Sequence, residues 1–238
     1  MIAVIMAAGK GSRLGEYTAD LPKSLLPLNE NGNTLLDYNL NILENLNIDR
    51  VLIVTGFNSE KIENHVMKKN KVQTIYNPFW AYCNVLGSLY MALPYIQDDF
   101  LFLHADTLAD IDIWKMLVSH KGDMVLPFQR KKCGDEEMKV VLDQNGDLLD
   151  ITKEVSPEKS QGEFLGIAKF SLSTVNFFKL TAERFFKQEK LNLYMESVIQ
   201  SAIQENEIQI RTMDILDHKF VEVDFEEDYL KAKTLFGI

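Results

Sequence analysis

The 238-residue sequence is poor in cysteine: Cys83 and Cys133 are its only two, and they lie far apart in the chain. This separation does not match the spacing of a metal site. We therefore expect a reduced protein with a cytoplasmic location.

Positive charge is also scarce, since 25 lysines and arginines face 35 aspartates and glutamates, for a net charge of −10. No block of like charges occurs, and a nucleic-acid-binding surface would need a basic stripe. No apolar stretch approaches the length of a membrane span. The first apolar run is short and meets glycine at once, so we expect no signal peptide and no membrane partner.

The four histidines, His65, His104, His120 and His218, are scattered and form no ligand cluster. A structural or solvated role is simpler than a catalytic one for each of them. The chain shows no repeat, low-complexity tract or linker. Its length is usual for one large α/β domain, which can bury a substantial core without disulfides.

Strand and helix patterns alternate through the first half, which predicts βαβ units on a parallel sheet. The predicted strands are 2–6, 51–55, 72–76, 100–104 and 124–128, and the predicted helices are 34–46, 58–69, 87–95 and 112–120. Thr34 is a plausible N-cap for the first of these helices.

The middle of the chain changes character. Strands are predicted at 139–142, 148–152 and 164–170, separated by polar turns that include Asn145-Gly146. We expect a small β-rich insertion, at about residues 130–170, that packs beside the main sheet. Helices 175–188, 193–204 and 226–236 and strands 208–213 and 220–223 complete one α/β domain over residues 1–238, with a Rossmann-like mixed, mostly parallel sheet flanked by helices.

The most informative segment follows the first strand and reads Ala7-Ala8-Gly9-Lys10-Gly11-Ser12-Arg13-Leu14, with Lys23 ten residues after Arg13. Small residues let backbone N–H groups approach phosphate oxygens closely. Arg13 offers a fork of donors and Lys23 a mobile point charge. These features predict a loop that holds a triphosphate.

Two better-known phosphate loops are excluded. A P-loop requires Gly, four residues and then Gly-Lys-Ser/Thr, which Gly9-Lys10-Gly11-Ser12 does not match. A dinucleotide fingerprint requires a third glycine where Leu14 stands, and Gly15 comes one position late.

This segment, together with Thr18 and Pro22-Lys23, resembles the signature of the sugar-phosphate nucleotidyltransferase superfamily. Within it the chain is most similar, over nearly its whole length, to the small cytidylyltransferases that activate phosphocholine or 2-aminoethylphosphonate. The resemblance implies a fold of the nucleotide-diphospho-sugar transferase type. It also implies Mg²⁺-dependent transfer of CMP from CTP to a small phosphorylated or phosphonate amino-alcohol, as in cell-surface glycan or lipid modification. CTP and this acceptor are the implied partners, and a homodimer is left open.

In an open α/β sheet, ligands bind beyond the carboxyl ends of the strands. Arg13 is expected to assist the pyrophosphate leaving group and Lys23 to stabilise charge at the α-phosphate. The nucleotide-binding candidates are Ala7, Ala8, Gly9, Gly11, Ser12, Asn84, Gly87, Ser88 and His104. Asn84 and Ser88 fit the start of a helix equally well, as caps.

Asp106 and Asp224 are the candidate Mg²⁺ ligands, because each follows a predicted strand and Mg²⁺ prefers one or two carboxylates with phosphates and waters. The resemblance assigns the metal to these two positions as well. The alternative for each is the N-cap of the helix that follows.

The acceptor candidates are Lys139, Lys153, Glu163, Trp80 and Tyr82. Glu163 lies in Gly162-Glu163-Phe164-Leu165-Gly166, which resembles a segment of the aminoethylphosphonate-type enzymes. A carboxylate there suits an ammonium group and a lysine suits a phosphate, although either type is also common as a solvated surface charge. Trp80 and Tyr82, with Phe79, suit a cage for a quaternary ammonium, or ordinary core packing.

Two other functions remain open. A sugar 1-phosphate uridylyl- or thymidylyltransferase is the second enzyme class, but Ala105-Asp106-Thr107 stands where the glucose-type enzymes usually carry Gly-Asp-Asn. A non-catalytic nucleotide-binding regulatory subunit should have lost Arg13, Lys23 or Asp106, and all three are present.

Overall fold

The computed structural model describes residues 1–237 and is built on a ten-stranded sheet. The strands run β3-β2-β1-β4-β10-β6-β9-β7-β8 across the sheet, and β11 also pairs with β6. Their bounds are β1 (Ile2–Ala7), β2 (Arg50–Thr55), β3 (Val72–Tyr76), β4 (Phe100–His104), β6 (Met124–Gln129), β7 (Lys139–Leu142), β8 (Leu148–Thr152), β9 (Gly162–Phe164), β10 (Ile167–Phe170) and β11 (Ile210–Asp214). Strands β1 to β4 are parallel, as are β6 and β11, whereas β7 to β10 pair antiparallel to their neighbours. The predicted mixed, mostly parallel sheet is therefore confirmed.

Seven α-helices and a small second sheet surround these strands in the described part of the chain. The helices are α1 (Leu35–Asn45), α2 (Ser59–Val66), α3 (Val85–Ala92), α4 (Ile111–Ser119), α5 (Val175–Phe186), α6 (Glu196–Glu205) and α7 (Glu226–Phe236). Strands β5 (Thr107–Ala109) and β12 (Phe220–Glu222) form the second sheet as an antiparallel pair. No helix in residues 1–237 is long and apolar enough to cross a membrane.

Strand periodicity divides the core into two layers. Successive side chains of β1 point to opposite faces of the sheet, so Val4 packs in one apolar cluster and Ile5 in another. Helices α3, α5 and α6 contribute to the first cluster, and α1, α2 and α4 to the second. Both faces are covered, which explains why β1 is buried along its whole length.

Helix α1 begins where the sequence predicts. Thr34 Oγ1 accepts a hydrogen bond from the Asp37 backbone N–H at 3.1 Å, and Asp37 Oδ2 accepts one from the Thr34 backbone N–H at 3.1 Å. This reciprocal pair satisfies two donors that a helix start otherwise leaves unpaired. Thr34 is therefore confirmed as the N-cap.

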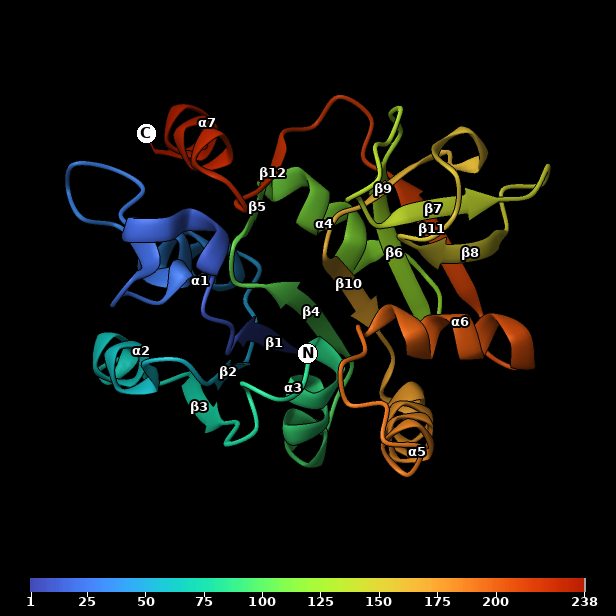
Figure 1. The fold of residues 1–238 in the computed structure, drawn as a ribbon, viewed down its shortest axis with the longest axis horizontal. Helices are drawn as coiled ribbons and strands as arrows, with labels where there is room; N and C mark the ends of the chain where they lie inside the picture. Colours follow the sequence, from blue (N-terminus) through green and yellow to red (C-terminus); the bar gives the residue numbers. More distant parts are fainter. Residues whose placement is uncertain (238) are drawn as a thin grey trace.

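The β-rich middle departs from expectation at one point. The strand predicted at 164–170 is two strands, β9 and β10, because Gly166 between them has a φ of +69°, which breaks an extended run. Strand β10 lies in the centre of the sheet between β4 and β6, whereas β9, β7 and β8 continue the sheet beyond β6. Figure 1 shows β7, β8 and β9 at one end of the molecule and β3 with α2 at the other. The region expected to pack beside the main sheet is thus continuous with it.

The chain end closes over the loop that follows β1. A third apolar cluster joins residues of α7 and β12 to Leu14, Leu26 and Leu28 of the N-terminal segment. Tyr229 of α7 donates a hydrogen bond from its hydroxyl to the Pro27 carbonyl. This packing brings the β12–α7 connection, and with it Asp224, against the N-terminal loop.

Candidate active site

The first pocket lies at the carboxyl ends of β1 and β4 and has a volume of about 200 Å³. Many predicted nucleotide-site residues line it: Ala7, Ala8, Gly9, Gly11, Lys23, Asn84, Ser88, His104 and Asp106. Residues that the sequence did not single out also line it: Met6, Ser24, Cys83, Val85 and Ala105. The position agrees with the rule that ligands of α/β sheets bind at this edge.

The loop after β1 is shaped around Lys23. Gly11 has a φ of +66°, and a Cβ built there would lie 3.0 Å from Lys23 Cβ, so glycine is required for both reasons. Thr18 Oγ1 donates to the Gly11 carbonyl at 2.8 Å and pins the loop. Ser12, also predicted to bind nucleotide, is exposed and does not line the first pocket.

Lys23 joins the two predicted metal ligands. Its Nζ lies 2.6 Å from Asp106 Oδ2 and 2.9 Å from Asp224 Oδ1. Burial lowers the pKa of Lys23, but the two carboxylates raise it by more, so its pKa ends above the ordinary value. Burial likewise raises the pKa of Asp224, whereas Lys23 and Arg13 lower it, and the net pKa is below the usual range. Lys23 is therefore a fixed cation between the carboxyl groups of Asp106 and Asp224.

Asp106 and Asp224 fit a divalent cation. They come from distant parts of the chain and converge on one point, and carboxylate oxygens are the ligands that Mg²⁺ prefers. Asp106 Oδ1 is buried and has no hydrogen-bond partner among residues 1–237, which leaves it free to bind a cation. Neither residue is a helix N-cap, because α4 is capped at Asp110 and α7 at Phe225.

Arg13 reaches the same cluster from the N-terminal loop. Its Nη1 lies 2.9 Å from Asp224 Oδ2, and its Nη2 lies 3.7 Å from Glu136 Oε2. Arg13 remains half exposed, so its guanidinium can contact a ligand as well as Asp224. Arg13 and Lys23 therefore lie in one cluster, with Asp224 as the residue that contacts both.

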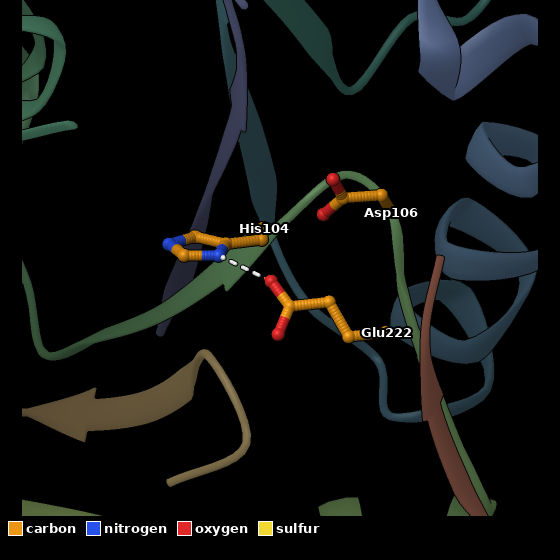
Figure 2. A group of neighbouring side chains, drawn as sticks. All are labelled: His104, Asp106 and Glu222. Carbon is orange, nitrogen blue, oxygen red and sulfur yellow. Dashed lines mark hydrogen bonds and ion pairs between the residues drawn. The ribbon is translucent and has the colours of Figure 1, made fainter. Parts of the chain in front are cut away.

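His104 lines both the first pocket and a neighbouring second one. Figure 2 shows His104, Asp106 and Glu222 pointing toward one another, with His104 Nδ1 3.4 Å from Glu222 Oε1. Burial lowers the pKa of His104, but Glu222, followed by Asp106, raises it by more, to about 9. One atom of each residue lies within 4.8 Å of the others, a spacing that could hold a metal. Asp106 belongs to this group as well as to the Lys23 cluster, so the two share one carboxylate.

The second pocket, about 520 Å³ in volume, is rich in charge. Five glutamates line it: Glu136 and Glu137 before β7, Glu163 on β9, Glu196 at the start of α6 and Glu222 on β12. Burial raises the pKa of Glu196, whose Oε2 has no hydrogen-bond partner among the described residues. Sequence reasoning found Glu163 but missed Glu196 and Glu222, although Glu222 stands only two residues before Asp224.

Cations and an aromatic ring complete this pocket. Lys131 Nζ lies 2.9 Å from Glu163 Oε2, and burial raises the pKa of Glu163 by more than Lys131 lowers it. The predicted Lys153 also lines the pocket, with its Nζ 5.7 Å from the ring centre of Tyr194. Lys131 and Tyr194 were not predicted.

Three acceptor candidates lie elsewhere. Lys139 is fully buried, and its Nζ donates to the carbonyls of Asp135, Glu137 and Lys153, so it organises the backbone and does not line the pocket. Trp80 lines the first pocket, where its ring packs edge-on against another aromatic side chain. Tyr82 is 77% exposed and lines neither pocket, so these rings form no cage around the second one.

Of the three candidates at helix α3, Asn84 and Ser88 line the first pocket and Gly87 does not. Asn84 is the N-cap of α3, where its Oδ1 accepts from the Val85 backbone N–H at 2.8 Å, and it also lines the first pocket. Ser88 lines that pocket one turn later. Gly87 does not line it, and a Cβ there would lie 2.6 Å from Cys83 Sγ, so glycine is needed for close packing.

Comparison with known proteins identifies the family of the chain and similar folds. Residues 3–163 match the family described as MobA-like NTP transferase domain. The CTP:phosphoglutamine cytidylyltransferase of Campylobacter jejuni is 22% identical over an alignment 250 residues long, which covers 96% of this chain and 97% of the relative. The choline-phosphate cytidylyltransferase of Haemophilus influenzae is 27% identical over 232 residues, covering 96% and 94%. The solved CTP:phosphocholine cytidylyltransferase of Streptococcus pneumoniae has a TM-score of 0.78 at 20% identity, with 98% of each chain covered. The resemblance noted from the sequence is thereby confirmed.

Proposed function

The chain belongs to the MobA-like NTP transferase domain family, and from that premise we propose that it transfers CMP from CTP to a small amino-bearing phosphate or phosphonate. The observation that carries this proposal is the Asp106–Lys23–Asp224 cluster, which lies where the first and second pockets meet. A nucleotide on one side and an acceptor on the other would bring their phosphorus groups together at these three side chains.

The transfer is a single displacement. An oxygen of the acceptor's phosphate or phosphonate attacks the α-phosphorus of CTP, a new P–O bond forms, and the bond to the bridging oxygen of pyrophosphate breaks. The attacking oxygen is already ionised at neutral pH, so no general base is required. Catalysis then consists of positioning and of stabilising the charge that builds in the transition state.

Each part of the N-terminal loop has a role in that step. Backbone N–H groups from Ala8 to Arg13 would hold the β- and γ-phosphates, and Arg13 would assist the leaving pyrophosphate. Lys23 would stabilise charge at the α-phosphate. Asp106 and Asp224 would hold Mg²⁺, which when bound neutralises and orients a triphosphate.

Glu163, Glu196 and Glu222 of the second pocket support an acceptor that carries an ammonium group. Glu163 is paired with Lys131, whereas Glu196 keeps an unpartnered oxygen in a buried position. A buried carboxylate without a partner is costly, and a cationic group would remove that cost. Lys153 would meet the acceptor's phosphate or phosphonate. The relatives named above are a choline-phosphate and a phosphoglutamine cytidylyltransferase. Acceptors of this class are therefore the ones to compare.

Pyrophosphate release tests the proposal most simply. Purified protein with Mg²⁺ is offered each of the four NTPs in turn with phosphocholine, phosphoethanolamine, 2-aminoethylphosphonate, phosphoglutamine or glucose 1-phosphate. We expect release with CTP and one of the amino-bearing acceptors, and its loss when the metal is chelated.

Other outcomes have definite meanings. Release with UTP or dTTP and glucose 1-phosphate would favour a sugar nucleotidyltransferase. CTP binding with no release from any acceptor would favour a regulatory subunit, and absence of nucleotide binding would refute the proposal.

A further inference from the structure

Asn77, directly after β3, is a fully buried amide whose orientation is fixed. The Phe79 backbone N–H donates to Asn77 Oδ1 at 2.9 Å, so the oxygen of the amide must face Phe79. The Nδ2 group therefore faces helix α3 and the turn before it, where it donates to Ser88 Oγ of the helix at 3.0 Å and to Cys83 Sγ of the turn at 3.3 Å. Exchanging the amide oxygen and nitrogen would set two N–H donors against each other, which excludes the flipped orientation.

This contact keeps the Ser88 hydroxyl hydrogen from pointing toward Asn77. A hydroxyl has one hydrogen to donate, and Ser88 Oγ already accepts the hydrogen of Asn77 Nδ2. Within residues 1–237 no protein group accepts a hydrogen bond from the Ser88 hydroxyl. Because Ser88 lines the first pocket, that hydrogen is available to a ligand there.

A hydroxyl hydrogen directed into the pocket distinguishes the two pyrimidines. N3 of cytosine is an acceptor, whereas N3 of uracil carries a hydrogen, and O2 accepts in both. We propose that Asn77 is a positioning residue that holds the Ser88 hydroxyl as a donor toward the pyrimidine edge and so favours CTP over UTP. This role rests on the proposed nucleotidyl transfer. A site that leaves a polar group unmatched discriminates more strongly than one that differs only in shape.

Asn77→Asp tests the direction of the hydroxyl. The Phe79 N–H can still donate to one carboxylate oxygen, while the Ser88 O–H and Cys83 S–H can donate to the other. These three donors favour the ionised form of the new carboxyl. Ser88 then offers only lone pairs to the pocket, which suit N3–H of uracil. We expect the dissociation constant for CTP divided by that for UTP to rise by about tenfold or more, so that binding shifts in favour of UTP. Calorimetry with Mg²⁺ at pH 8 measures both constants.

Ser88→Ala is the matched control. It removes the hydroxyl without reversing it, so CTP and UTP should bind with nearly equal affinity. In the double variant, Asn77→Asp should have no further effect on the ratio. A purely structural role for Asn77 would weaken both nucleotides alike and leave the ratio unchanged.

Each result decides the matter. A folded Asn77→Asp variant that keeps the wild-type preference overturns the role of Asn77. If that variant does not fold, an unchanged ratio in Ser88→Ala overturns it instead, and equalised binding supports it. Wild-type protein that binds CTP and UTP equally refutes this specificity but leaves nucleotidyl transfer standing, whereas wild-type protein that binds neither refutes both.

Discussion

Lys23 is the residue on which the account of the reaction depends most. Among residues 1–237 it is the one cation that contacts both Asp106 and Asp224, and the proposed transition state needs positive charge at this place. We expect Lys23→Ala to lower kcat by about 10²-fold or more, with the fold intact by circular dichroism. Lys115→Ala, on exposed α4 surface, is the control and should behave as wild type. A folded Lys23→Ala variant with near-normal kcat would contradict the role given to Lys23.

Lys139 and Lys153 should separate stability from acceptor binding. Lys139→Ala leaves three carbonyls without their buried donor, and we expect a loss of about 2–3 kcal/mol in the free energy of unfolding, measured with urea. Lys139→Met keeps the aliphatic stem and should lose less. Lys153→Ala should raise the acceptor KM with stability changed by less than about 0.5 kcal/mol. A stable Lys139→Ala protein with a raised acceptor KM would restore the role first predicted for Lys139.

Sequence reasoning at the residue scale succeeded where chemistry follows directly from chain position. Lys23 and Asp106 follow strands β1 and β4, and residues at those strand ends meet at one edge of the sheet. Glu196 and Lys131 were missed because they reach the second pocket from a helix start and a loop that only the tertiary fold brings together. Lys139 was misassigned because a single lysine beside a valine run gives no sign of the three carbonyls around it.

At the scale of elements, the start of α1 gives a pH-dependent prediction. Burial raises the pKa of Asp37, but hydrogen bonds from His65 and Thr34 lower it by more, so the pKa in the folded protein is below its ordinary value. Asp37 therefore stabilises the fold above its unfolded pKa of about 3.9, and the contribution is lost as pH falls through the folded pKa.

Two variants separate the contribution of the Asp37 carboxylate to this cap from that of the Thr34 hydroxyl. Asp37→Asn should cost about 1 kcal/mol at pH 7, and the difference from wild type should shrink below about pH 3. Thr34→Ala should cost a similar amount at pH 7 and keep more of that deficit at pH 3, because the bond from the Asp37 backbone N–H to Thr34 Oγ1 does not titrate, whereas the bond from Thr34 Oγ1 to Asp37 Oδ2 does. Urea unfolding at pH 7 and pH 3 measures both, and an equal deficit of Asp37→Asn at the two values would contradict the account.

Periodicity predicted most elements correctly because the parallel strands are buried apolar runs and the helices carry one apolar face. It failed for short or interrupted elements. Strand β5 has three residues, too few for a pattern, and the break between β9 and β10 depends on the left-handed conformation of Gly166. Apolar residues flank this break on both sides, so the pattern alone reads as one strand.

At the scale of the whole molecule, the candidate active site joins parts of both sheets and of the flanking helices. Strands β1 and β4 and helix α3 supply the first pocket, while β9, α6 and β12 supply glutamates to the second. Helix α7 packs on the N-terminal segment and holds Asp224 at the junction. The sequence predicted a single α/β domain but not this closure, because the contacts of α7 join residues about 200 positions apart.

The most direct test of the central claim, CMP transfer between these two pockets, is ³¹P NMR of the product. Protein, Mg²⁺ and CTP are incubated with the amino-bearing acceptor that gives pyrophosphate release. We predict equal amounts of pyrophosphate and of a new cytidine compound in which the acceptor phosphorus is coupled through oxygen to the α-phosphorus of CMP. Phosphate release without that coupled pair, or CMP joined to no acceptor, would contradict the account.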